Sequence, residues 1–105
     1  MKNETEVSRH GQQCLRAVGL RAIRVRAGKV AVKGGYMQLA PAGWPDFVVP
    51  LPLGRVLWWE SKTPTGKLSE DQKRVHASLR RMGHSVITTS DAAHLVECAI
   101  AIQRA

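Results

Sequence analysis

Three residues in the middle of the chain, Asp46, Glu60 and Lys62, have types and a spacing suited to metal-assisted hydrolysis. Residues two apart in a strand point to the same face of a sheet, so Glu60 and Lys62 should project together, beside Trp58. Asp46 begins the preceding predicted strand. If these two strands pair, Asp46 and Glu60 converge at one edge of the sheet with Lys62 next to them.

Two carboxylates and one ammonium group at such short range are costly as a purely structural arrangement. The carboxylates repel each other, and the lysine offsets only part of that repulsion. A divalent cation resolves the conflict, because carboxylate oxygens are the ligands that Mg²⁺ or Mn²⁺ prefers. The cation would polarise a phosphodiester while Lys62 positions the attacking water or helps to deprotonate it. The spacing alone is weak evidence, since this gap varies among nucleases.

The charge of the chain points to a polyanionic partner. Its 105 residues include 16 Lys and Arg against 8 Asp and Glu, a formal charge of +8, with 44% apolar residues. Between Glu6 and Asp46 there is no acidic residue and there are seven basic ones, Arg9, Arg16, Arg21, Arg24, Arg26, Lys29 and Lys33. A folded protein of this kind most simply binds nucleic acid. The candidates for phosphate contacts are Arg21, Arg24, Arg26, Lys29 and Lys33, for which a merely solvated surface is the alternative.

The length predicts one compact domain with a core of its own. No apolar run reaches the ~18 residues that a membrane span requires, and the charged beginning of the chain lacks the apolar stretch of a signal peptide. We therefore expect a cytoplasmic protein without a membrane partner.

The elements that must position the three residues follow from periodicity and turn signals. Helices are predicted at 4–18, from the Ser69 cap to 82, and after a Ser90 cap, with Val7, Cys14, Leu15 and Val18, and Val75, Leu79 and Met82, facing inward. Strands are predicted at 20–27, 46–49, 55–62 and 85–89, and the partner of 20–27 is expected at 29–33 or 36–39, around Gly34-Gly35. The predicted order, α-β-β-β-β-α-β-α, indicates an α/β domain with a mixed central sheet flanked by helices.

Five separated motifs occur in order along the chain. They are Gly43-x-Pro45-Asp46, Glu60-x-Lys62, Gly66, Leu68-Ser69-x-x-Gln72 and a helix that ends at Gly83. Together they resemble the VRR-NUC (virus-type replication-repair nuclease) family of the PD-(D/E)XK superfamily, from Glu4 to about Thr89. The resemblance implies one restriction-endonuclease-like domain over residues 1–105 and a Mg²⁺- or Mn²⁺-dependent DNA endonuclease. Stand-alone phage-type members act on branched DNA such as Holliday junctions as homodimers, so DNA and a second copy are the implied partners.

The resemblance also assigns roles to individual residues. Asp46 and Glu60 would hold the metal, with the backbone carbonyl of Ser61 within reach, and Lys62 would be the catalytic lysine. Gln72 matches the family's glutamine beside the active site, although Ser69 and Gln72 also form a capping box that needs no catalysis. The family places a glutamate on the first helix. Helix phase favours Glu4, which shares the inward face of Val7, with Glu6 as the alternative; both could simply complement the helix dipole. Trp44 departs from the family's usual aliphatic residue.

The sequence is also compatible with two further interpretations. The chain could be a non-catalytic basic nucleic-acid-binding module with structural carboxylates, although a pure binder has no use for Asp46 and Glu60 beside Lys62. Unpaired bases could stack on the three tryptophans, Trp44, Trp58 and Trp59, but core packing is expected for at least one of them. Residues 28–40 are the predicted dimerisation hairpin.

Overall fold

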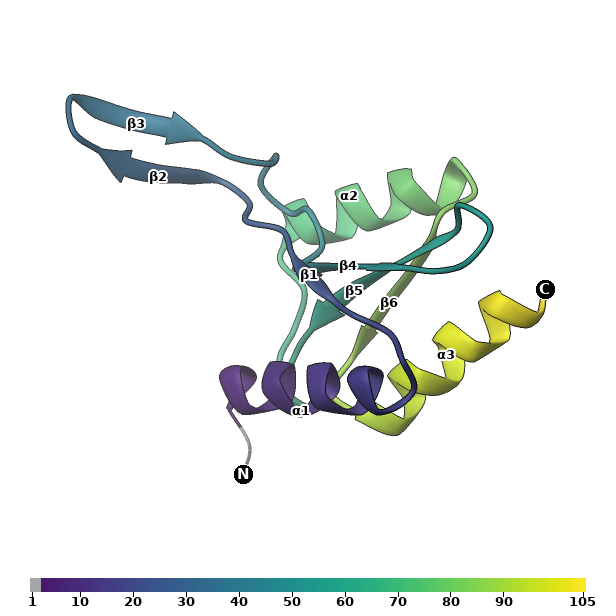
Figure 1. The fold of residues 1–105 in the computed structure, drawn as a ribbon. Helices are drawn as coiled ribbons and strands as arrows, with labels where there is room; N and C mark the ends of the chain where they lie inside the picture. Colours follow the sequence, from purple (N-terminus) through teal and green to yellow (C-terminus); the bar gives the residue numbers. More distant parts are fainter. Residues whose placement is uncertain (1–2) are drawn as a thin grey trace.

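The computed structural model describes residues 3–105, and Figure 1 shows their arrangement. The helices are α1 (Glu4–Ala17), α2 (Glu70–Arg81) and α3 (Ala92–Arg104). The strands are β1 (Ile23–Arg24), β2 (Lys29–Val32), β3 (Gly35–Gln38), β4 (Phe47–Pro50), β5 (Val56–Ser61) and β6 (Ser85–Thr89). Among the residues that the structure describes, no helix has both the length and the apolar character needed to cross a membrane.

The central sheet has the strand order β1-β4-β5-β6. Its first three strands are antiparallel, and β5 pairs with β6 in parallel, so the sheet is mixed. Helix α2 covers one face, while α1 and α3 cover the other (Figure 1). This architecture confirms the predicted fold class. The order contains one strand more than predicted, because both arms of the hairpin form strands.

The core lies mainly between the sheet and the pair α1 and α3. Alternate residues of β4 and β5 point to this side and are buried with one leucine from each helix: Phe47, Val49, Leu57, Trp59, Leu15 and Leu95. Gly11 of α1 permits the close approach, because a Cβ there would collide with the ring of Trp59. The Trp59 ring stacks on Phe47 with centroids 4.6 Å apart, which confirms core packing for this tryptophan. Trp44 and Trp58 are half-buried and meet edge to face on the α2 side.

The helix boundaries follow from their caps. The predicted capping box of α2 is confirmed, because the Ser69 hydroxyl accepts from the Gln72 N–H at 3.1 Å and the Gln72 Oε1 accepts from the Ser69 N–H at 2.8 Å. The prediction that Ser90 caps α3 is wrong. The cap is Asp91, whose carboxylate accepts from the N–H groups of Ala93 and His94. An aspartate caps as well as a serine, and here it lies one residue closer to the helix.

The strand predicted at 20–27 is shorter, and its predicted partner is wrong. Only Ile23–Arg24 forms a strand, and it pairs with β4. The arms of the hairpin pair with each other instead, because the glycines at 34 and 35 both adopt positive φ and close a tight turn between β2 and β3. The hairpin extends away from the sheet and the helices (Figure 1).

The inward faces of the helices were only partly predicted. Val18 and Met82 are 46% and 65% exposed, because each is the C-cap residue at the end of its helix. Cys14 and Val75 are half-buried. Val7, Leu15 and Leu79 are buried as predicted, together with three residues that the apolar pattern missed, Ser8, Gly11 and His76.

Candidate active site

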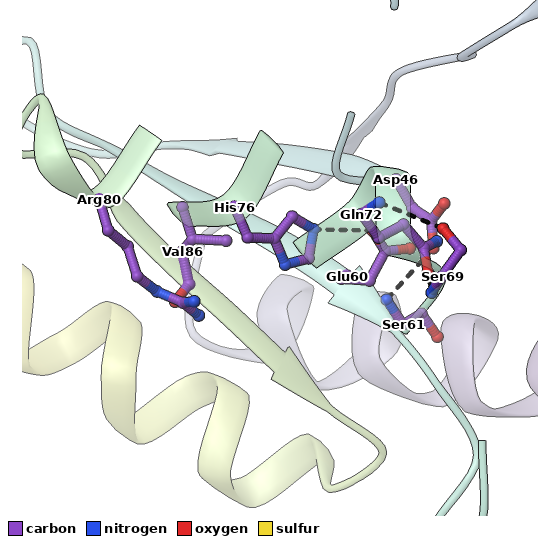
Figure 2. Close-up of polar contacts among 8 residues, drawn as sticks. All are labelled: Asp46, Glu60, Ser61, Ser69, Gln72, His76, Arg80 and Val86. Carbon is purple, nitrogen blue, oxygen red and sulfur yellow. Dashed lines mark hydrogen bonds and ion pairs between the residues drawn. The ribbon is translucent and has the colours of Figure 1, made fainter. Parts of the chain in front are cut away.

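The register between β4 and β5 brings Asp46 and Glu60 to the same end of the sheet. Phe47 lies opposite Trp59 in this antiparallel pair, so Asp46, the residue before Phe47, and Glu60, the residue after Trp59, are neighbours. The Oδ2 atom of Asp46 accepts a hydrogen bond of 3.2 Å from the backbone N–H of Ser61 (Figure 2). The convergence predicted for the two carboxylates is therefore present in the structure.

Burial makes this pair of carboxyl groups hard to ionise. Desolvation and the adjacent carboxyl group of Glu60 raise the pKa of Asp46 to about 7, against the lowering effect of Ser61 and Arg24. Burial also raises the pKa of Glu60, while its contact with Asp46 and the charge of Lys62 oppose that rise. The pair therefore retains a proton near neutral pH unless another positive charge joins it.

Helix α2 holds Glu60 from one side of the sheet. The Nε2 atom of His76 lies 3.1 Å from Oε1 of Glu60, and both side chains are almost completely buried (Figure 2). Burial, followed by the charge of Arg80, lowers the pKa of His76, so the ring is neutral at neutral pH. The other carboxylate oxygen, Oε2 of Glu60, is buried and has no hydrogen-bond partner among residues 3–105.

Helix α1 holds the site from the opposite side. The buried Ser8 hydroxyl donates to the carbonyl of Glu4 and contacts the hydroxyl of Ser61, each at 3.0 Å. Ser61 is itself completely buried, and its N–H is the group that bonds Asp46. Ser61 thus links α1, the end of β5 and the carboxylate of Asp46.

The other predicted site residues lie around this pair at different distances. Lys62 is half-buried and lowers the pKa of Glu60, and it lines a pocket of about 270 Å³ with Thr88. Glu4 lines a pocket of about 240 Å³ with Asp46 and raises the pKa of Glu60. Glu6 does not line that pocket, so the structure places Glu4, the residue favoured by helix phase, on the side of the carboxylates.

The start of α2 is pressed against the loop that leads to Asp46. Gly43 has φ of 91°, and a Cβ at this position would collide with the backbone of Asp71 and Gln72. Only glycine combines this conformation with so close an approach. The loop therefore places the backbone of Gln72 near the site, while the side-chain oxygen of Gln72 is committed to the cap at Ser69.

The five predicted phosphate-binding residues are all exposed. Arg24 is closest to the carboxylates: its guanidinium lies 4.9 Å from the centre of the Phe47 ring, and it lines the same pocket as Asp46 and Glu4. Arg21 and Arg26 flank β1, and Lys29 and Lys33 lie on the hairpin. Arg26, Lys29 and Lys33 therefore lead from Arg24 toward the projecting hairpin, whereas Arg21 lies at the other end of β1, and the structure does not gather the five side chains around the carboxylates.

The donor set at the end of β5 fits a hard divalent cation. Its features are a buried oxygen of Glu60 that has no hydrogen-bond partner among residues 3–105, and an adjacent carboxyl group, that of Asp46, that ionises with difficulty. Within the described part of the chain, no three Asp, Glu, His or Cys side chains are placed to bind one metal ion. The side-chain donors that the structure brings together there are the two carboxyl groups of Asp46 and Glu60. This suits Mg²⁺, which is commonly bound through one or two carboxylates and keeps several waters.

Sequence reasoning missed two residues of this arrangement, Ser8 and His76. For each of them the sequence contains a signal that could have predicted its position. Ser8 and Gly11 lie three apart on one helix face and are small, which indicates close packing at that point. His76 lies four residues after Gln72, so both share one face of α2.

Comparison with known proteins shows that the chain is similar to a phage protein described as a nuclease and to a solved VRR-NUC domain. No family model matches it. Over 62 residues it is 37% identical to a protein of Acyrthosiphon pisum secondary endosymbiont phage 1 described as "Putative nuclease p44". That match covers 59% of this chain and 64% of the relative, less than two thirds of the relative's length. A solved structure described as "VRR_NUC domain" superposes with a TM-score of 0.66 at 21% identity, covering 92% of this chain and 94% of that one. The fold is thus that of a VRR-NUC domain, as the motifs predicted.

Proposed function

We propose that this protein is a metal-dependent DNA endonuclease. The observation that carries the proposal is the pair of half-buried Asp46 and buried Glu60, in which one carboxyl group has a pKa of about 7 and the other has an oxygen without a hydrogen-bond partner among residues 3–105. Such a pair is unfavourable without a cation and well suited to hold one. The VRR-NUC fold and the phage relative both support a nuclease.

In this proposal Asp46, Glu60 and the backbone carbonyl of Ser61 hold Mg²⁺ or Mn²⁺. When bound, the cation supplies Lewis-acid polarisation of the phosphodiester. The ammonium group of Lys62, two residues after Glu60, positions the attacking water and promotes its deprotonation by stabilising the hydroxide that forms. Glu4 contributes negative charge from α1, and Gln72 fixes the first turn of α2 beside the site.

The exposed basic residues give the proposed path for the DNA backbone. Arg24 lies at the pocket shared with Asp46, Arg26, Lys29 and Lys33 continue from it toward and onto the hairpin, and Arg21 lies on the other side of β1. Backbone contacts of this type bind DNA through phosphate neutralisation, without reading the sequence. Residues 28–40 form the self-paired hairpin, which we propose joins two copies of the chain.

A homodimer would favour branched DNA as the substrate, a Holliday junction in particular. A four-way junction presents two equivalent strands related by a two-fold axis, and a C2 dimer presents two active sites in the same relation. This argument rests on symmetry. It makes junction cleavage the finer part of the proposal and phosphodiester cleavage the broader part.

The test is a cleavage assay on linear duplex, flap, splayed-arm and four-way-junction DNA with Mg²⁺, Mn²⁺ or EDTA. We expect cutting with either metal, none with EDTA, and the highest rate on the junction. The Asp46→Asn and Lys62→Ala variants should lose cleavage, while the exposed control Gln13→Ala should retain it.

The outcomes separate the parts of the proposal. No cleavage of any substrate with either metal would favour the alternative, a non-catalytic basic binding module. Cleavage by Asp46→Asn at the wild-type rate would remove the assigned site even if the protein is a nuclease. Equal rates on all four DNA structures would refute junction preference alone.

A further inference from the structure

The interface between α2 and the sheet contains an unusual group of buried polar atoms. Four buried side-chain atoms have no hydrogen-bond partner within residues 3–105, and they belong to Trp58, Glu60, His76 and Thr88. Three of these residues lie on neighbouring strands: Trp58 and Glu60 are alternate residues of β5, and Thr88 is the partner of Glu60 in β6. The fourth, His76 of α2, contacts Glu60. Within residues 3–105, one side-chain hydrogen bond connects members of this group: it joins Nε2 of His76 to Oε1 of Glu60, at 3.1 Å.

The chemistry of the two side chains fixes the direction of this bond. An ionised carboxylate can only accept, so Nε2 of His76 must carry the hydrogen whenever Glu60 is ionised. The imidazole is held in a helix and is 1% exposed, which leaves it little freedom to turn away. The bond therefore commits Oε1 of Glu60 to the protein, while Oε2 has no hydrogen-bond partner in the described part of the chain.

We propose that His76 is a positioning residue, which orients the carboxylate of Glu60 through Oε1 so that Oε2 is the oxygen presented to the divalent cation. The inference rests on the proposed function and extends it to a residue outside the assigned ligand set. Outer groups that orient a ligand in this way commonly change metal affinity by roughly 10- to 100-fold when they are removed.

A role in stability alone is the poorer explanation of this histidine. Its Nδ1 is buried without a partner in the described structure, which costs free energy that an aliphatic side chain would not incur. Leu79, one turn further along the same helix, shows that this interface accepts a leucine. A buried polar pair is often matched or exceeded in stability by well-packed apolar residues. The hydrogen bond between His76 and Glu60 is explained better by its effect on the orientation of the Glu60 carboxylate.

The test compares three substitutions of His76 by their affinity for Mn²⁺, measured from the electron paramagnetic resonance signal of free Mn²⁺ without DNA. His76→Leu removes the donor and keeps the side chain apolar and large. His76→Gln retains an N–H donor at similar reach, whereas the amide of His76→Asn is too short. The matched control is Val75→Ala, which trims the neighbouring half-buried residue of α2 and leaves the bond intact.

We expect His76→Leu and His76→Asn to raise the Kd for Mn²⁺ by roughly 10- to 100-fold. His76→Gln should return it to within about threefold of wild type, and Val75→Ala should leave it unchanged. The metal concentration at half-maximal cleavage should shift in parallel. If His76→Leu does not fold, the comparison of the Gln and Asn variants decides the question.

Two negative results have different meanings. The role of His76 would be overturned if His76→Leu and His76→Asn both bound Mn²⁺ with wild-type affinity. It would also be overturned if the Gln and Asn variants bound Mn²⁺ equally more weakly than wild type. Either result would leave the proposed nuclease intact. Absence of Mn²⁺ binding by the wild-type protein would overturn the metal site itself, and the role of His76 with it.

Discussion

The carboxyl groups of Asp46 and Glu60 show how a single pair of side chains can link protonation, metal binding and stability. In the structure they meet in a partly desolvated position, and the pKa of Asp46 rises from 3.8 to about 7. A group with a raised pKa stabilises the folded state below its unfolded pKa, and that contribution is lost as the pH rises through the folded value. The relevant window here lies between about pH 4 and pH 7.

The first prediction concerns this window in the absence of metal. Between about pH 5 and about pH 8, wild-type protein in EDTA should lose on the order of 2 kcal/mol of unfolding free energy relative to Asp46→Asn, whose side chain cannot ionise. His76, whose lowered pKa disfavours its protonated form at acid pH, opposes this loss in both proteins. Because the charge of Asp46 raises the pKa of His76, Asp46→Asn strengthens that opposing effect in the variant, and the difference between the two proteins keeps its sign. Urea denaturation at the two pH values measures it.

Addition of Mg²⁺ or Mn²⁺ at the higher pH should restore stability to the wild type only. Ligand binding to the folded state stabilises by RT ln(1 + [L]/Kd), about 2.7 kcal/mol at a hundredfold excess over Kd. Parallel pH profiles for the two proteins, or equal stabilisation of both by metal, would contradict the assignment of Asp46.

At the scale of elements, the site is held by hydrogen bonds from both sides of the sheet. His76 of α2 bonds Glu60, and Ser8 of α1 contacts Ser61, whose N–H in turn bonds Asp46. The strand end is thereby fixed between two helices. We expect the α1 contact to contribute measurably to stability because both hydroxyls are buried.

The second prediction is a double-mutant cycle on this contact. Ser8→Ala should cost about 1 kcal/mol of unfolding free energy, because it leaves the buried Ser61 hydroxyl without its partner. Adding Ser61→Ala should cost less than the sum of the two single changes, since removing both hydroxyls leaves neither unsatisfied. Urea denaturation provides all four free energies, with Gln13→Ala as an exposed α1 control. Strict additivity would show that the two hydroxyls do not interact.

The elements also show which features can be predicted from sequence. Alternation along β4 and β5 was sufficient to predict that Asp46 and Glu60 converge, because one face of each strand is apolar and fixes the register. The capping box of α2 was equally local and equally predictable. The partner of β1 was not, because β4 and the hairpin arms offer comparable short apolar segments. Only the closed turn at Gly34-Gly35 decides between them.

His76 and Ser8 escaped prediction for a related reason. Periodicity shows which residues share a helix face, but it does not show which strand residue that face meets. A polar side chain on an inward face gains its partner only from the tertiary arrangement. The roles of Lys62, Glu4 and Gln72 remain predictions, supported by their positions around the carboxylates.

At the scale of the whole molecule, the hairpin of β2 and β3 is the part least explained by the folding of one chain. Cross-strand partners share a face, so Val30 and Met37 lie together with Val32. These three side chains are 38%, 50% and 44% exposed, whereas the opposite face carries Lys29, Ala31 and Tyr36. An apolar face exposed on a projecting hairpin is suited to association with a second copy.

The third prediction follows from this face. Wild-type protein should have the mass of a dimer in light scattering, and the Val30→Glu, Met37→Lys double variant should be a monomer. The new charges lie opposite each other and attract, so the hairpin should remain paired. Ala31→Glu with Tyr36→Lys is the matched control on the other face and should remain dimeric.

The monomeric variant should still cut DNA but lose the paired cuts on a four-way junction. A monomeric wild type would remove the symmetry argument for junctions and leave the nuclease proposal standing. A dimeric double variant would place the interface elsewhere on the molecule.

The hairpin belongs to a separate two-stranded sheet, joined to the central sheet by two short segments bridged at Ala27 and Ala40. Neither carboxylate, nor any residue that bonds them, belongs to it. Its length, charge and apolar residues can consequently change over generations without moving Asp46 or Glu60. The proposed chemistry and the proposed assembly therefore depend on separate parts of one chain, which are free to evolve at different rates.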